Sequence, residues 1–254
     1  MKAIFFGMEC RFSRPTLAAL LAVGIDVRAV VVPRPRSVRA GASGAPIRRL
    51  EPPRPARGLA LPAVSTERSI LGLAGAASVP VFEVGRLAHE ETLAVLRDPR
   101  PDVIVVACFP RLLPPALLDL PRHGALNVHP SLLPAYRGPQ PLFWIFHDGL
   151  EHAGVTVHLM DSGADTGDIM AQQPLALPDG ISYAGAEQRC AEVGARLVVE
   201  AARGLDTGTL ARRPQPGVGI SYAPAPRPED FVVAPDWSAR RAFNFTRGMA
   251  DRHG

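Results

Sequence analysis

Apolar runs alternate with amphipathic stretches from the start of the chain. Lys2 to Gly7 and Asp26 to Val32 have the length and composition of buried strands, and Asp102 to Cys108 is apolar after its first residue. Between the first two runs, Ser13 to Thr16 opens a helix of alanines and leucines that ends near Gly24. This order predicts a right-handed strand-helix-strand unit. We therefore expect an α/β, Rossmann-like protein with a mostly parallel sheet flanked by helices.

The pattern continues through the rest of the chain. Further strands are expected at Val79 to Val84, Ala125 to His129, Gly154 to Met160, Asp168 to Leu177 and Gly219 to Tyr222. Further helices are expected at Leu87 to Arg97, Pro114 to Leu120 (short), Gln140 to Gly149 and Tyr183 to Arg203. No Gly-x-Gly-x-x-Gly follows the first strand, which argues against a dinucleotide cofactor.

The stretch from Asn127 to Gly138 carries the first candidate chemistry. Asn127 and His129 should project from one face of their strand, because residues two apart on a strand point the same way. The strand stops at Pro130, and open α/β sheets bind ligands beyond the carboxyl ends of their strands. An amide N–H aimed at an oxyanion, beside an imidazole that exchanges a proton, suits acyl transfer to an amine.

A second polar element follows the run Gly154 to Met160. Residues 161–168 contain three aspartates and two glycines, which predicts a tight polar loop. Taken alone, Asp165 is a typical turn former, and it gains weight only beside the Asn-x-His pair. His158, on the preceding strand, is interpreted as a packing residue.

Together the two stretches resemble the folate-dependent formyltransferase family, which includes methionyl-tRNA formyltransferases and sugar N-formyltransferases. The family signature is Asn-x-His, then Ser-Leu-Leu-Pro-x-x-Arg-Gly, and later Asp-x-Gly-x-Asp-Thr-Gly, and both halves are present. The resemblance runs from Met1 to about Thr246 and is most specific between Asn127 and Asp168. It implies a formyltransferase fold and an enzyme of one-carbon metabolism.

The resemblance also implies residue roles. Asn127, His129 and Asp165 would be catalytic, and the formyl donor would be 10-formyltetrahydrofolate, released as tetrahydrofolate. The donor would contact three segments: Arg111, Leu112 and Leu113; Ser131, Leu132, Leu133 and Pro134; and Asp161, Ser162, Gly163 and Ala164. Ser131 lacks a Gly-x-Ser-x-Gly elbow, so a serine hydrolase is disfavoured and a turn or folate contact is the better interpretation.

Composition narrows the class of protein further. Hydrophobic residues make up 47% and charged residues 20% of the 254, which fits neither a disordered nor a membrane-spanning chain. Early charges such as Glu9 and Arg11 interrupt the apolar runs before a signal or membrane segment could form. The three cysteines show no paired metal-ligand spacing. We expect a cytoplasmic protein without disulfide, structural zinc or membrane contact.

The net charge of +4 conceals a basic segment. The stretch from Arg34 to Arg57 contains seven arginines and a single acidic residue, Glu51, which gives a local charge of +6. The rest of the chain is therefore slightly acidic. Residues 33–68 are also rich in proline, which excludes a helix or a central strand. The segment is either a solvated insertion or an arm that grips phosphates, and in the methionyl-tRNA branch of the family an insertion here contacts the tRNA.

Domain organisation follows from the C-terminal part of the chain. Residues 1–223 are expected to form the catalytic domain, with the insertion at 33–68, and residues 224–254 a linker and a short helical extension. Asp236 to Arg247 resembles the helix that introduces the small C-terminal β-domain of the family, and the chain ends before that domain could form. Apolar surface around Phe243 and Phe245 would suit a dimer.

The acceptor stays open between an amino-sugar nucleotide or other small amine and methionyl-tRNA. Trp144 stands where tRNA-specific enzymes commonly have arginine, and it is either a stacking platform for a sugar or a core residue. Two rival functions also remain. One is hydrolysis of 10-formyltetrahydrofolate, and the other is tRNA binding through the arginine segment with a relic transferase site.

Overall fold

A computed structural model describes residues 1–35, 44–51, 69–250 and 252. The chain forms two compact units, Met1–Asn127 and Val128–Gly254. Strand β6 (Ala125–His129) ends the first unit and begins the second. The division expected at residue 223 stays a prediction.

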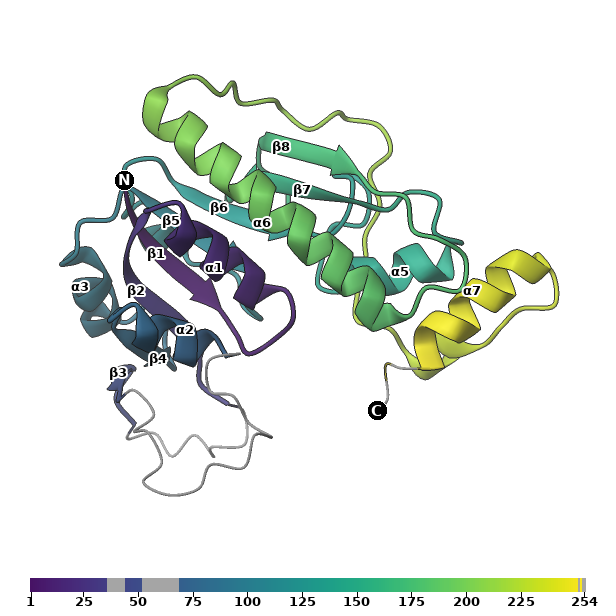
Figure 1. Cartoon of the computed structure of the whole chain (residues 1–254), viewed down its shortest axis with the longest axis horizontal. Coiled ribbons are helices and arrows are strands. Elements are labelled where there is room, and N and C mark those ends of the chain that lie inside the picture. The colour runs from purple at the N-terminus through teal and green to yellow at the C-terminus, as the bar shows by residue number, and fades with distance from the viewer. Residues whose placement is uncertain (36–43, 52–68, 251, 253–254) are drawn as a thin grey trace. The chain divides into compact units, whose positions relative to one another are not determined.

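The first unit is built on parallel strands. β1 (Lys2–Gly7) pairs in parallel with both β2 (Asp26–Pro33) and β5 (Val103–Ala107), and β2 pairs in parallel with β4 (Val81–Val84). The strand order is β3-β4-β2-β1-β5 (Figure 1). All of β5 is buried, which explains why it reads as a continuous apolar run. The predicted mostly parallel α/β architecture is confirmed.

Among the described residues, the helices of this unit are α1 (Ser13–Ala22), α2 (Ile70–Ala76), α3 (Glu90–Arg97) and α4 (Pro115–Leu118). α3 begins three residues later than the sequence predicts because His89 caps it, its ring nitrogen accepting the Glu91 N–H at 3.3 Å. The sequence pattern does not predict α2, since its small apolar residues show no amphipathic period. Its start is fixed by Ser69, whose hydroxyl accepts the Gly72 N–H at 2.8 Å.

The basic segment contributes an edge strand. β3 (Ile47–Leu50) pairs antiparallel with β4, a position that a proline-rich neighbourhood tolerates. Arg34 and Arg48 each lie 3.0 Å from the buried Glu83 carboxylate, so these two guanidinium groups already have a partner. Arg36, Arg39, Arg54 and Arg57 lie outside the described residues. Contact of this segment with tRNA stays a prediction.

The second unit holds an antiparallel pair. β7 (Gly154–Leu159) pairs with β8 (Ile169–Pro174), and α6 (Tyr183–Thr207) packs along both (Figure 1). The other helices described here are α5 (Pro141–His147), the 3-10 helix η2 (Pro228–Phe231) and α7 (Ala239–Ala250). The strand predicted at 219–222 is wrong, because an isolated bridge from Arg137 to Tyr222 forms there instead of a ladder. Within the described ranges, no helix is long and apolar enough to cross a membrane.

Candidate active site

β6 ends on the two residues that the sequence singles out. Asn127 is half-buried and His129 is buried, and their alternate positions place both side chains on one face of the strand. Pro130 follows at once and stops the strand. The strand therefore delivers an amide and an imidazole to its carboxyl end, as predicted.

The imidazole of His129 has a defined tautomer. Its Nε2 lies 2.9 Å from the Tyr136 carbonyl oxygen, which can only accept, so Nε2 carries the hydrogen. In the neutral ring the lone pair is then on Nδ1. Nδ1 lies 3.7 Å from the Asp165 carboxylate, too far for a hydrogen bond but close enough to stabilise a positive charge. His129 is thus set up to accept a proton at Nδ1.

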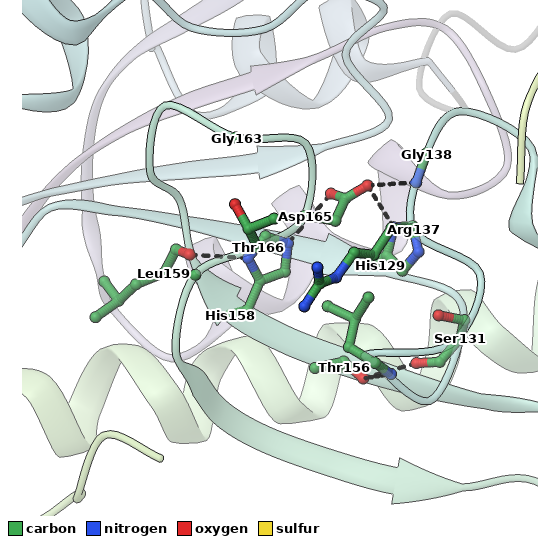
Figure 2. Close-up of polar contacts among 12 residues, drawn as sticks. His129, Ser131, Arg137, Gly138, Thr156, His158, Leu159, Gly163, Asp165 and Thr166 are labelled. Carbon is green, nitrogen blue, oxygen red and sulfur yellow. Dashed lines mark hydrogen bonds and ion pairs between the residues drawn. The ribbon is translucent and has the colours of Figure 1, made fainter. Parts of the chain in front are cut away.

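Asp165 is the centre of the polar cluster (Figure 2). Its Oδ2 accepts the Gly138 N–H at 2.8 Å, and its Oδ1 lies 3.3 Å from His158 Nε2. The backbone of Asp165 has φ +56°, in the left-handed region that aspartate tolerates better than most residues. One carboxylate thereby links the loops that follow β6 and β7.

The loop that carries Asp165 is closed by its own side chains. Asp161 accepts hydrogen bonds from the Gly163 N–H at 3.0 Å and the Thr166 hydroxyl at 2.6 Å. Gly167 must lack a side chain, because a Cβ there would lie 1.9 Å from the Leu159 carbonyl oxygen. The aspartate and glycine content that predicts a tight loop is therefore explained by these contacts, because Asp161 closes the loop and Gly167 fits where no side chain could.

The pKa values of the cluster follow from burial and charge. Burial lowers the pKa of His129 below its usual 6.5, and the Asp165 charge only partly offsets this. Burial alone would raise the pKa of Asp165, but the facing histidines and the Gly138 N–H outweigh it and lower that pKa. At neutral pH the pair is accordingly a carboxylate beside an imidazole that is free to take a proton.

His158 is the residue whose role the sequence pattern misses. The pattern favours packing, and His158 is indeed buried, yet its Nε2 faces Asp165 and its Nδ1 lies 2.8 Å from the Leu159 carbonyl oxygen. His158 therefore helps to orient the carboxylate. The sequence feature that could have indicated this role is the position of His158 at the carboxyl end of β7, directly before the aspartate loop.

The Ser131 to Pro134 turn is held from β7. The Thr156 hydroxyl donates to the Ser131 carbonyl oxygen at 2.7 Å and accepts the Leu133 N–H at 3.1 Å. The Ser131 hydroxyl is buried and donates to the Ala135 carbonyl oxygen at 2.7 Å. The turn role predicted for Ser131 is the one that the structure shows, and a folate contact there stays a prediction.

A segment without regular structure, residues 213–223, binds both the loop after β6 and the loop that carries Asp165. The Gln215 amide donates at 2.8 Å to the carbonyl oxygens of Asp165 and Gly167, and its oxygen accepts from the buried Arg137 guanidinium at 2.7 Å. The Ser221 hydroxyl accepts the Tyr136 N–H at 2.8 Å. We name residues 213–223 the strap. No motif or periodicity in this segment indicates such a role.

Other predicted contact residues have structural duties. Arg111, in the first unit, donates to the carbonyl oxygens of Val84 and Gly85 at 2.7 and 2.8 Å and so covers the end of β4. Leu112 is 62% exposed, and Leu113 is buried. In the second unit, Asp161, Ser162 and Ala164 are exposed and Gly163 is half-buried.

Trp144 is half-buried on α5 and packs edge-on against Phe143 and His147. Its indole N–H donates to the Pro224 carbonyl oxygen at 2.9 Å. Trp144 is thus fixed by packing and a hydrogen bond but is not part of the buried core, and stacking of a sugar on it stays a prediction.

An α/β fold in which a buried histidine at a strand end faces a carboxylate on a neighbouring loop is typical of an enzyme that uses acid-base catalysis. The formyl transferase family model matches residues 22–202, and the chain belongs to this family. It is 34% identical to a methionyl-tRNA formyltransferase of Pelotomaculum thermopropionicum, over 98% of this chain and 72% of that one. It is 38% identical to the methionyl-tRNA formyltransferase of a Synechocystis species, over 98% of this chain and 70% of that one.

Solved structures agree on the fold. A sugar N-formyltransferase from a Shewanella species superposes with a TM-score of 0.63 at 13% identity, covering 97% of this chain and 87% of that one. An N-formyltransferase from Helicobacter canadensis was solved with folinic acid and dTDP-3-aminofucose. It superposes with a TM-score of 0.64 at 16% identity, covering 100% of this chain and 82% of that one. The formyltransferase fold expected from the sequence is confirmed.

Proposed function

We propose that this protein transfers a formyl group from 10-formyltetrahydrofolate to a primary amine. The observation that carries the proposal is the Asp165 carboxylate held between His129 and His158, next to the strand end that also bears Asn127. Membership of the formyl transferase family supports the same chemistry. The folate ligand of the Helicobacter canadensis structure supports the class of donor.

In the proposed reaction the amine nitrogen attacks the formyl carbon, and the carbonyl oxygen becomes an oxyanion. Asn127 donates its amide N–H to that oxygen. His129 accepts the proton that the nitrogen loses, at Nδ1, where the Asp165 carboxylate stabilises the resulting imidazolium. The new C–N bond is then complete.

The second half of the reaction returns the proton. His129 donates it to N10 of the folate as the bond from the formyl carbon to N10 breaks, so tetrahydrofolate leaves neutral at that nitrogen. The Tyr136 carbonyl keeps Nε2 protonated throughout, which reserves Nδ1 for the transfer. Asp165, fixed by the Gly138 N–H, remains a carboxylate in both halves.

The donor is proposed to contact the segments that the family resemblance implies: residues 111–113, 131–134 and 161–164. The exposed Leu112 and the exposed residues of the aspartate loop have surface to offer a ligand. The Ser131 hydroxyl and most main-chain polar groups of the 131–134 turn already have partners within the chain. We therefore assign this turn apolar contacts.

For the acceptor we place methionyl-tRNA first. Sequence identity of 34–38% to methionyl-tRNA formyltransferases, over nearly the whole chain, supports it. The sugar enzymes share the fold at much lower identity. An amino-sugar nucleotide is the second candidate, and the described residues of the basic segment do not separate the two.

The test is release of tetrahydrofolate from 10-formyltetrahydrofolate against a panel of acceptors. We expect turnover that requires methionyl-tRNA, with uncharged tRNA as the matched control that lacks the amine. Turnover that requires an amino-sugar nucleotide would keep the transferase and replace the acceptor. Equal turnover with no acceptor would make the protein a hydrolase, and no turnover combined with salt-sensitive tRNA binding would leave a binding protein.

The pH profile provides a further prediction. Because burial lowers the pKa of His129, its ring stays neutral at pH values below the usual histidine pKa of 6.5. The value of kcat/KM should therefore stay level at neutral pH and fall only in more acidic solution. Asp165 raises that pKa, so Asp165→Asn should shift the acidic limb to still lower pH besides slowing the reaction. An acidic limb that stays in place in Asp165→Asn would show that the carboxylate does not act on His129.

A further inference from the structure

Two cysteines follow the carboxyl ends of neighbouring strands in the first unit. Cys10 follows β1 and Cys108 follows β5, and these strands pair in parallel up to Gly7 and Ala107. The Cys10 sulfur lies 3.3 Å from the Ser13 hydroxyl, which donates to the carbonyl oxygen of Ala107, the residue before Cys108. Cys108 is exposed and Cys10 is half-buried. Cys108 also has φ +57°, a backbone conformation uncommon for a cysteine.

Cys10 lies at the start of α1. Its sulfur accepts the Ser13 N–H at 3.4 Å and lies 3.3 Å from the Ser13 hydroxyl, in a Cys-x-x-Ser arrangement. The positive end of a helix dipole stabilises a thiolate at such a place. Together the Cys108 thiol and the Ser13 and Phe12 contacts lower the pKa of Cys10 to about 6, against the opposing effect of burial.

Ser13 also fastens the two strand ends to each other. Its hydroxyl donates to the Ala107 carbonyl oxygen at 2.6 Å and accepts the Met8 N–H at 3.1 Å. The chain segments that carry Cys10 and Cys108 are thus tied through one buried side chain. This keeps the two chain segments side by side without a covalent bond.

Cys190 supplies the internal contrast. It is fully buried on α6, and burial raises its pKa to about 12. A buried, protonated thiol of this kind is unreactive.

We propose that Cys10 and Cys108 are a redox-active thiol pair that a hydroperoxide converts into an intramolecular disulfide. The Cys10 thiolate attacks a peroxide oxygen, the O–O bond breaks, and the second oxygen leaves as water or alcohol after taking up a proton. The Cys108 thiol then attacks the Cys10 sulfenic acid, forming the S–S bond and releasing one water. The peroxide is reduced by two electrons, and the thiol pair is oxidised by two.

The test uses the full chain and hydrogen peroxide. After treatment, thiols are blocked under denaturing conditions and the protein is digested for mass spectrometry. We expect a linked Cys10–Cys108 peptide, about 2 Da lighter than the sum of the reduced peptides because two hydrogens are lost, with Cys190 still blocked as a free thiol. Dithiothreitol should reverse the change. Random oxidation that includes Cys190, or no linked peptide at all, would overturn the proposal.

Two variants separate the roles of the thiols. Cys108→Ser should leave a Cys10 sulfenic acid that dimedone captures, whereas Cys10→Ser should slow the reaction with peroxide by about tenfold or more, since its thiolate is the attacking group. Alkylation of Cys10 by iodoacetamide should have its pH midpoint near 6 rather than near the ordinary value of about 8.5. Equal peroxide reactivity in both variants, or a midpoint at the ordinary value, would also overturn the proposal. Because both substitutions replace sulfur with oxygen at half-buried or exposed sites, circular dichroism should show unchanged folds.

Discussion

His129→Ala is expected to lower kcat for formyl transfer by about 10²–10⁴-fold, the usual cost of losing a general acid/base. The reason is that Nδ1 of this ring is the proposed proton acceptor, held in place by the Tyr136 carbonyl on the other nitrogen. The affinity for tetrahydrofolate should remain close to that of the wild type, because the imidazole acts on the reacting atoms. Single-turnover kinetics and folate titration would separate the two quantities.

The matched control is His152→Ala. His152 is exposed, so its removal should leave both kcat and folate affinity unchanged. Wild-type turnover in His129→Ala would remove this histidine from the mechanism. If His129→Ala lost both folate binding and turnover, His129 would belong to the folate-binding site instead.

Asn127→Ala is expected to lower kcat by about 10²–10³-fold, the cost of one oxyanion donor. Asn127→Asp keeps the size and shape of the side chain and removes the amide N–H, so it should be at least as slow. The measurement is kcat with the acceptor identified by the panel, alongside folate affinity as a check on the fold of the site.

The pair of variants distinguishes donation from packing. If Asn127 only filled space, Asn127→Asp would retain turnover and Asn127→Ala would lose it. Such a result would contradict the assigned role. Large losses in both variants, with folate affinity retained, are the outcome that the proposed oxyanion contact requires.

Much of the fold could be predicted because buried parallel strands leave a clear pattern in the sequence. The predicted bounds of β5 and β6 agree with the structure to within a residue. For β5 the reason is that a continuous apolar run between polar residues is typical of a buried strand. The loop around Asp165 was predictable for a related reason. The tight backbone of this loop leaves no room for a side chain at Gly167. A requirement of this kind involves only residues close in sequence, so it leaves a pattern that the sequence shows.

What could not be predicted depends on contacts between distant residues. His158 gains its role only from where Asp165 lies in space, and a strand pattern cannot separate this from packing. Gln215 binds the Asp165 loop from fifty residues away, in a segment with no periodicity. The strand expected at 219–222 does not form because that segment directs its backbone hydrogen bonds to residues 134–140 at scattered positions rather than along a ladder.

The strap has a consequence for how this site comes apart. Backbone hydrogen bonds tie the strap to Ile169 at one end and to Arg137 and Gln140 at the other. Between these ends, Gln215 and Ser221 bind the loops that carry Asp165 and Tyr136. Irregular segments of this kind exchange their amide hydrogens through local opening, well before the whole chain unfolds. Opening of the strap would release the Tyr136 and Asp165 loops in the same event. The proposed proton acceptor and the charge that supports it would thus be lost as one cooperative unit. Heat or a proteolytic cut at the strap would then abolish activity while most of the secondary structure persists.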